Sequence, residues 1–183
     1  MPVIGNVTRF ALEFEFVDVA SEDRTRVWLN GRVGIWCGAT RLGRFDLITS
    51  LQIVMLQIER VLRDVGNRAN PRFRGLPARD VWATLNDGMY GGSDPSTVEL
   101  ADAEQWARHE ISLHVDALDD WKLFVVDDAG RERVVWRKRG ESTTSELVVS
   151  AGEVDAVLRH ARDVLDEAFR ARAGDHRARG GDA

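Results

Sequence analysis

The sequence predicts an α+β fold, in which two main amphipathic helices pack on an antiparallel β-sheet of about six to seven strands. Three observations support this class. Apolar and polar residues alternate over short stretches in both halves of the chain, with the period of two that is typical of strands. Each group of such stretches leads into a longer segment whose apolar residues recur every three to four positions, as on a helix. Links of hairpin length between the stretches favour antiparallel pairing.

The first group of strands begins at residues 10–17, where aromatic and aliphatic side chains alternate with mostly polar ones. A polar turn is expected at residues 21–24. The dipeptide Asn30-Gly31 then predicts a hairpin between strands at 26–29 and 33–37. The reason is that both central positions of a type I′ turn require a positive φ.

A short extended piece at 40–45 leads into the first amphipathic helix, which is expected at about 50–65. Asp46 or Ser50 can cap its start, and Gly66-Asn67 can end it. Its apolar residues form one continuous stripe: Leu51, Val54, Met55, Ile58, Val61, Leu62 and Val65. The helix is therefore expected to be scaffold, lying across the sheet.

A long irregular region is expected from residue 66 to about residue 102, with one short helix at 78–85. It contains three of the four prolines and many glycines. A connection of this length without secondary structure is unusual in a compact domain. The region is therefore expected to be functional or partly ordered.

A second group of strands is expected at residues 110–115, 121–126 and 132–138, with a tight turn at 127–130. Residues 145–149 can add a fourth strand. Together with the first group, these strands are expected to form the antiparallel sheet.

The second amphipathic helix is expected at about 152–170, because Ser150 and Glu153 have the spacing of a capping box. Its apolar face holds Val154, Val157, Leu158, Ala161, Val164, Leu165, Ala168 and Phe169. Residues 172–183 are rich in Gly, Ala and Arg and are expected to be a disordered tail. The chain is thus predicted to form a single α+β domain over residues 1–171.

The composition is that of a soluble globular protein, with 44% hydrophobic and 30% charged residues in 183. No apolar run is long enough to span a bilayer, and the N-terminus lacks the features of a signal peptide. The single cysteine, Cys37, allows no internal disulfide, which favours a cytoplasmic location. The net charge of −5 argues against a nucleic-acid partner.

The sequence contains no recognisable catalytic motif, and no catalytic, cofactor-binding or metal-binding residue is predicted. His109 and His114 are five apart, so they do not share one face of a strand or a helix. Cys37 ends an apolar strand and is expected to be a core residue. The glycines fit neither a phosphate loop nor a dinucleotide fingerprint. The chain is therefore expected not to be an enzyme.

The charge pattern of residues 80–107 predicts the candidate site. This segment carries six acids and no base, whereas residues 66–79 carry four arginines and no acid. A solvated acidic loop would explain the run, and so would a surface complementary to a basic partner, with Tyr90 among its aromatic anchors. The second interpretation predicts these partner-binding residues: Asp80, Asp87, Tyr90, Asp94, Glu99, Asp102 and Glu104.

A series of short motifs runs in order through the first third of the chain. They are VIGN at 3–6, RFALEFE at 9–15, WLNGR at 28–32, IWCG at 35–38, LGRF at 42–45 and the segment from Thr49 to Arg68. This series resembles the bacterial immunity protein 42 family of polymorphic toxin systems, and residues 121–124 and 134–136 are loosely similar to it. The resemblance implies a cytoplasmic antidote that binds a cognate toxin and occludes its active site or a nearby surface.

Two other functional classes remain open. Loop carboxylates such as Asp87, Asp94 and Glu99 could form the site of a small enzyme, although no His, Lys or metal set accompanies them. Alternatively, the arginines of 68–79 with Phe73 could serve a nucleic-acid or regulatory binding module, against which the acidity of the chain argues. Of these classes, the antidote is preferred: its partner would be a basic toxin protein, with no nucleic acid or membrane involved and the oligomeric state left open.

Overall fold

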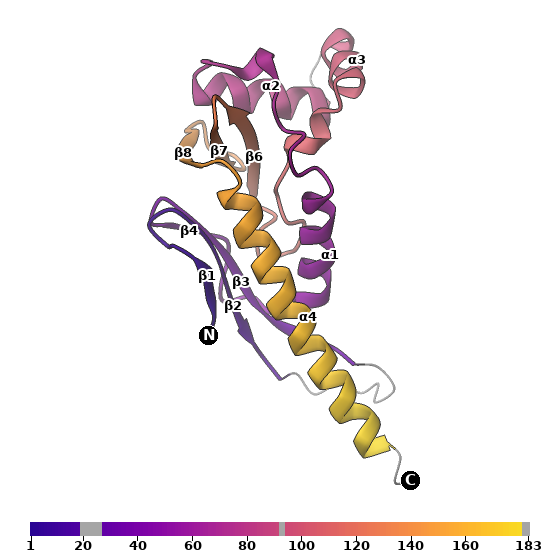
Figure 1. Ribbon diagram of the computed structural model, residues 1–183. Coiled ribbons are helices and arrows are strands. Elements are labelled where there is room, and N and C mark those ends of the chain that lie inside the picture. The colour runs from indigo at the N-terminus through magenta and orange to yellow at the C-terminus, as the bar shows by residue number, and fades with distance from the viewer. Residues whose placement is uncertain (19–26, 92–93, 181–183) are drawn as a thin grey trace. The chain divides into compact units, whose positions relative to one another are not determined.

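The computed structural model describes residues 1–18, 27–91 and 94–180, with the backbone alone for 175–180. The chain forms two compact units and passes between them four times, twice within a helix. Unit 1 comprises Met1–Glu59, Leu113–Asp119 and Ala156–Ala183, and unit 2 comprises Arg60–Ser112 and Asp120–Asp155. Each unit has its own antiparallel sheet (Figure 1). The α+β class is confirmed, but the prediction that all strands share one sheet is wrong.

Unit 1 contains a five-stranded sheet in which β1–β4 are neighbours in sequence order and β5 also pairs with β3. Its strands are β1 (Val3–Gly5), β2 (Phe10–Phe16), β3 (Asn30–Cys37), β4 (Thr40–Leu42) and β5 (Thr49–Ser50). Leu12 and Phe14 of β2 are completely buried, as predicted, but the opposite face is not exposed as expected, because Ala11 and Glu13 are buried as well. The polar turn expected at residues 21–24 lies outside the described residues.

Asn30-Gly31 is not a turn, contrary to the sequence prediction. Both residues lie inside β3, and neither has a positive φ. A Cβ atom on Gly31 would lie 2.1 Å from the Glu15 carbonyl oxygen and 2.5 Å from Leu51 Cδ1. The glycine therefore permits close packing of β2, β3 and the following helix. The hairpin turn is instead at Gly38-Ala39, where φ is 58° and 66°, the positive values that a type I′ turn requires.

Helices α1 (Leu51–Leu62) and α4 (Glu153–Gly180) correspond to the two predicted amphipathic helices. Most of the predicted stripe of α1 is buried, including Ile58. Helix α4 begins as expected, with the Ser150 amide donating to Glu153 Oε2 at 3.2 Å. It continues to Gly180, beyond the predicted end at about residue 170. In unit 1, Arg172 donates to the Trp28 carbonyl oxygen at 3.3 Å, an anchor that the composition of the tail does not reveal.

Unit 2 contains a three-stranded sheet with the order β6-β7-β8. The strands are β6 (Trp121–Asp128), β7 (Arg131–Lys138) and β8 (Ser145–Ser150). The predicted tight turn is confirmed, because Asp128 pairs with Arg131 across two residues of positive φ. The strand expected at 110–115 is reduced to one bridge between Glu110 and Phe124. The Leu123 amide donates to the Ser112 hydroxyl at 3.0 Å, in place of the backbone carbonyl that it would meet in a regular strand pair.

The region expected to be an irregular loop is largely helical. It contains the 3₁₀ turns η1 (Pro71–Phe73) and η2 (Trp106–His109) and the helices α2 (Ala78–Tyr90) and α3 (Pro95–Ala103). Helix α2 extends beyond the predicted 78–85 and ends at Gly91, with φ at 89°. Helix α3 starts at Asp94-Pro95, an N-cap followed by proline at the first helical position. The number of prolines and glycines was therefore misleading, because several of them mark helix ends.

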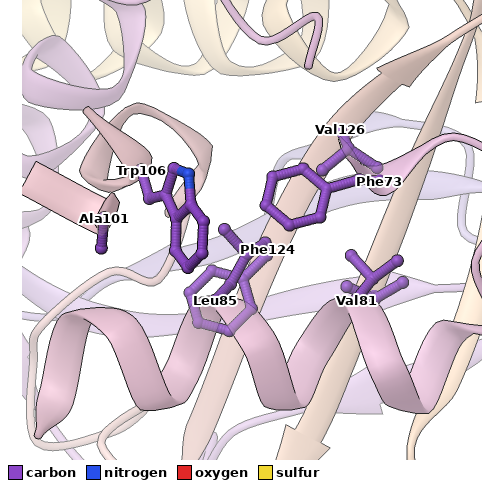
Figure 2. Packing of buried hydrophobic residues seen from close by; sticks show 8 residues of the cluster. Phe73, Val81, Leu85, Ala101, Trp106, Phe124 and Val126 are labelled. Atoms are coloured by element: carbon purple, nitrogen blue, oxygen red, sulfur yellow. The ribbon is translucent and has the colours of Figure 1, made fainter. Parts of the chain in front are cut away.

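Helix α2 covers the sheet of unit 2 through a single hydrophobic core. Figure 2 shows Val81 and Leu85 of α2 directed toward Phe73 and Phe124, with Trp106 beside them. The rings of Phe73 and Trp106 meet edge to face, with centroids 5.5 Å apart. This core fixes the helices that carry the predicted acidic site.

Candidate functional site

Helices α2 and α3 hold the predicted partner-binding residues and are packed closely together. At Gly88, on the buried side of α2, an added Cβ atom would lie 2.7 Å from the Trp106 ring and 2.8 Å from Ala101 Cβ. The absence of a side chain at this position allows α2 to approach both α3 and η2. The acids on the outer sides of both helices are therefore carried by two elements that pack directly against each other.

On α2, Asp80 and Asp87 are seven residues apart and so lie on the same face, away from buried Val81 and Leu85. Asp80 is partly exposed and contacts its neighbour Arg79, with 3.2 Å between Oδ1 and Nε. Asp87 is exposed and accepts a long hydrogen bond from Asn86 at 3.4 Å. Neither contact is strong enough to prevent binding to another protein.

On α3, Glu99 and Asp102 are exposed and lie one helical turn apart on the side opposite buried Ala101. Within the described part of the chain, neither forms an ion pair. With Asp80 and Asp87 of α2, they form what we call the α2–α3 acidic surface. These four residues are the part of the predicted site that remains available to a partner.

Asp94 has a structural role that the charge pattern did not indicate. It is the N-cap of α3, accepting the Ser96 amide at 3.1 Å, the Ser96 hydroxyl at 2.7 Å and the Thr97 hydroxyl at 2.9 Å. These bonds, that of the Ser96 hydroxyl foremost, lower the pKa of the carboxyl. The sequence Asp-Pro-Ser-Thr contains this signal, because an acceptor followed by proline is typical of a helix start.

Glu104 is held by three other side chains of unit 2. Its carboxylate accepts from Arg72 Nη2 at 3.0 Å, from Asn70 Nδ2 at 2.9 Å and from Trp106 Nε1 at 2.9 Å. These hydrogen bonds, with that of Arg72 the largest effect, lower its pKa to about 2. Glu104 therefore joins η1 to the end of α3 and is not a free charge.

Tyr90, the predicted aromatic anchor, is 47% exposed but fixed in position. Its hydroxyl donates to Glu110, and Lys122 Nζ lies 3.9 Å from the centre of its ring. Partial burial, and then the hydrogen bond to Glu110, raise the pKa of the phenol. Tyr90 can therefore offer the exposed part of its ring to a partner without losing rotational freedom on binding.

The basic segment that the nucleic-acid alternative required is partly built into the fold. Arg68 is 1% exposed and donates to Asp155 Oδ1 at 2.5 Å and to the Val61 carbonyl oxygen at 2.7 Å. Phe73 is equally buried, in the core of unit 2. Two of the residues on which that alternative depended therefore support the fold.

The other predicted chemical features are also structural. Cys37 is buried, as expected, and burial raises the pKa of its thiol well above its usual range. His109 is buried, and its Nδ1 donates to the Val125 carbonyl oxygen at 3.0 Å. Among the described residues, no group of three His, Cys, Asp or Glu side chains is arranged to hold a metal ion. In the same part of the chain, no helix combines the length and apolar character needed to cross a membrane.

Comparison with known proteins identifies the family. A model of the family described as immunity protein 42 matches residues 1–164. The chain belongs to this family. The match covers far more of the chain than the N-terminal motifs that suggested it, and it includes both helices of the candidate surface.

The fold of this family member is also similar to a solved structure, the crystal structure of CdiI from Burkholderia dolosa AUO158. The two chains superpose with a TM-score of 0.64 at 20% sequence identity, and the similarity covers 91% of this chain and 99% of the other. At this identity the likeness shows a shared fold. No curated protein sequence matches the chain significantly.

Proposed function

We propose that this chain is a cytoplasmic antidote that binds a cognate toxin protein and neutralises it by covering its active site or its substrate-binding surface. Membership of the immunity protein 42 family carries this proposal. The structure supports a binding role rather than a chemical one, because the carboxylates suggested for an enzyme have other surroundings. Asp94 caps a helix, while Asp87 and Glu99 lie exposed on separate helices.

The surface proposed to contact the toxin is the α2–α3 acidic surface, with Asp94 and Tyr90 at its margin. Three of its four acids are exposed, and its helices pack against the core of unit 2, so little backbone entropy should be lost when a partner binds. Such a surface favours a basic partner. A toxin that acts on nucleic acid would fit, since its active-site cleft must attract a polyanion.

Glu104 is assigned a supporting role in this proposal. Its hydrogen bonds to Arg72 and Trp106 fix the end of α3, which carries Glu99 and Asp102. A change at Glu104 would therefore affect binding through the position of α3.

The experiment compares two triple charge reversals. In the test variant, Asp87, Glu99 and Asp102 are replaced by Lys; Asp94 is left unchanged because it caps α3. The matched control replaces three other exposed acids, Asp116, Asp120 and Glu167, so that the change in net charge is the same. The partner is a catalytically inactive form of the cognate toxin.

Calorimetric titration should show that the test variant binds the toxin about 100-fold or more weakly, while the control binds like the wild type. Equal affinity of the two variants would contradict the assignment of the surface. If the wild-type chain itself fails to bind the toxin, the proposed function is wrong.

A further inference from the structure

The two edges of the sheet in unit 2 differ in what covers them. The outer side of β6 is occupied: the Asp127 amide donates to the Arg68 carbonyl oxygen at 3.0 Å, and the Ile111 amide donates to Leu123 at 3.0 Å. The outer side of β8 has no such neighbour. Within the described part of the chain, its only paired strand is β7.

Strand register identifies which backbone groups of β8 point outward. Asp128 and Arg131 flank a two-residue turn, so they exchange both hydrogen bonds of a closely bonded pair. Along β7, successive residues direct their amide and carbonyl groups alternately toward β6 and toward β8. Arg131 directs its groups toward β6, so Glu132, Val134 and Trp136 direct theirs toward β8. Their partners on β8 are Val149, Leu147 and Ser145.

The remaining residues of β8, Glu146, Val148 and Ser150, therefore direct their amide and carbonyl groups away from the sheet. The Ser150 amide agrees with this assignment, because it donates to the Glu153 side chain. Two amides and two carbonyls, those of Glu146 and Val148, are left without a partner in the described residues. These groups form the open edge of β8.

This edge lacks the features that normally prevent strand addition. Natural sheets protect an open edge with proline, lysine, a bulge or projecting charge. Strand β8 has the sequence SELVVS, with neither proline nor lysine. Its single charge, Glu146, is bonded to Arg133 Nε of the same sheet at 2.5 Å, and Val148 is 45% exposed.

We propose that the open edge of β8 pairs with β8 of a second copy of this chain, forming a weak two-fold symmetric dimer with a continuous six-stranded sheet. The two-fold axis passes beside Leu147. Glu146 then lies opposite the partner's Val148, and Val148 lies opposite the partner's Glu146. Each pair exchanges two hydrogen bonds, so the four open groups of each chain are all used.

A second copy fits this edge because the side chains, like the backbone, are self-complementary. The register places Leu147 against the partner's Leu147 on one face of the sheet. On the other face no like charges are opposed, since Glu146 meets an apolar residue and is already paired with Arg133. The contact is isologous, as in most dimers, but one strand from each chain makes a small interface. Association is therefore expected to depend on concentration.

Sedimentation velocity of the full chain, from about 10 μM to about 1 mM, tests this dimer. The wild type should shift from monomer toward dimer, and Val148→Pro should stay monomeric over the whole range. The substitution removes an outward amide, so the bonds between β7 and β8 are retained. Val148→Lys, which adds a protecting charge to the edge, should give the same result if the proline variant does not fold. A wild-type chain that stays monomeric, or a Val148→Lys dimer, would overturn the proposal.

Disulfide cross-linking tests the register separately. Leu147→Cys should form a linked dimer on mild oxidation, because the two residues form a non-hydrogen-bonded pair with close Cβ atoms. Val148→Cys is the matched control and should remain unlinked. In this register the two Val148 residues lie diagonally across from each other and not directly opposite. The native Cys37 is buried and should not interfere. Linking of Val148→Cys in preference to Leu147→Cys would overturn this register.

Discussion

The carboxylates of residues 80–104 are of two kinds, and the difference lies in their surroundings. Glu104 accepts hydrogen bonds from Asn70, Arg72 and Trp106 and thus holds two segments together. Glu99 and Asp102, only a few residues earlier, are exposed and form no ion pair within the described residues. The same charge therefore supports the fold in one place and remains available for binding in another. Changes around Glu104 should reduce stability, and changes on the α2–α3 acidic surface should reduce binding alone.

The largest effect on the supporting region is expected for Trp106→Ala. The side chain is 1% exposed, contacts Phe73 and fills the space left by Gly88. Its removal creates a cavity and should lower the free energy of unfolding by about 3–5 kcal/mol. Denaturant unfolding followed by circular dichroism measures this loss. A loss under about 1 kcal/mol would show that this core does not hold the acidic helices.

The next largest effect is a dependence of stability on pH that arises at His109. Burial, foremost, and the nearby Arg108 and Arg68 charges lower its pKa from 6.5 to about 4 in the folded chain. Between these values the unfolded chain binds the proton more tightly, so stability falls as the pH is lowered from 6.5 to 4. The total loss is about 3 kcal/mol at most.

Unfolding measured across this pH range checks the effect of His109. His109→Asn can still donate to the Val125 carbonyl oxygen but does not titrate, so it should remove most of the slope whatever it does to the absolute stability. An unchanged slope in this variant would assign the pH dependence to other groups.

A smaller loss is expected for Glu104→Ala. It leaves the indole nitrogen of buried Trp106 without its acceptor and frees Arg72, but part of the cost is offset by water at this partly exposed site. The expected loss of stability is about 1–2 kcal/mol. Urea unfolding of this variant beside Asp102→Ala, which should be close to wild type, measures the difference between the two kinds of carboxylate. Equal losses would remove the distinction.

The smallest effect on stability is expected for the joint reversal of Asp87, Glu99 and Asp102 to Lys. Exposed charges without fixed partners contribute little to folding, so the thermal midpoint should change by about 2 °C or less. Differential scanning calorimetry checks this point. A much lower midpoint would mean that these residues also support the fold, and a loss of toxin binding by this variant could then not be attributed to the surface.

Sequence reasoning succeeded where local pattern alone determines structure. The pattern over residues 10–17 and the stripe from Leu51 to Val65 predicted a strand and a helix that correspond to β2 and α1, although Glu13 is buried and Val65 lies beyond the end of α1. It failed at Asn30-Gly31, where the glycine is required for close packing between elements, which a turn rule does not consider. It predicted only the first part of α2, and it missed α3, whose few apolar positions give a weak helical period.

For the candidate site, the sequence predicted the charge but not its division into two roles. The partners of Glu104 include Asn70 and Arg72, more than thirty residues earlier in the chain. Their contact with Glu104 depends on the packing of Phe73 and Trp106, which local patterns do not describe. The cap at Asp94 is different, because Asp-Pro-Ser-Thr is a local signal and could have been recognised.

The measurement that tests the central claim most directly is the activity of the cognate toxin that the proposal requires, titrated with the purified wild-type protein. The proposal predicts that toxin activity falls linearly as the protein is added and reaches zero at a fixed molar ratio of protein to toxin, as expected for tight binding. Under the same conditions, the joint reversal of Asp87, Glu99 and Asp102 should leave most of the activity intact. Full toxin activity in an excess of the wild-type chain would contradict the proposal that this protein is the antidote.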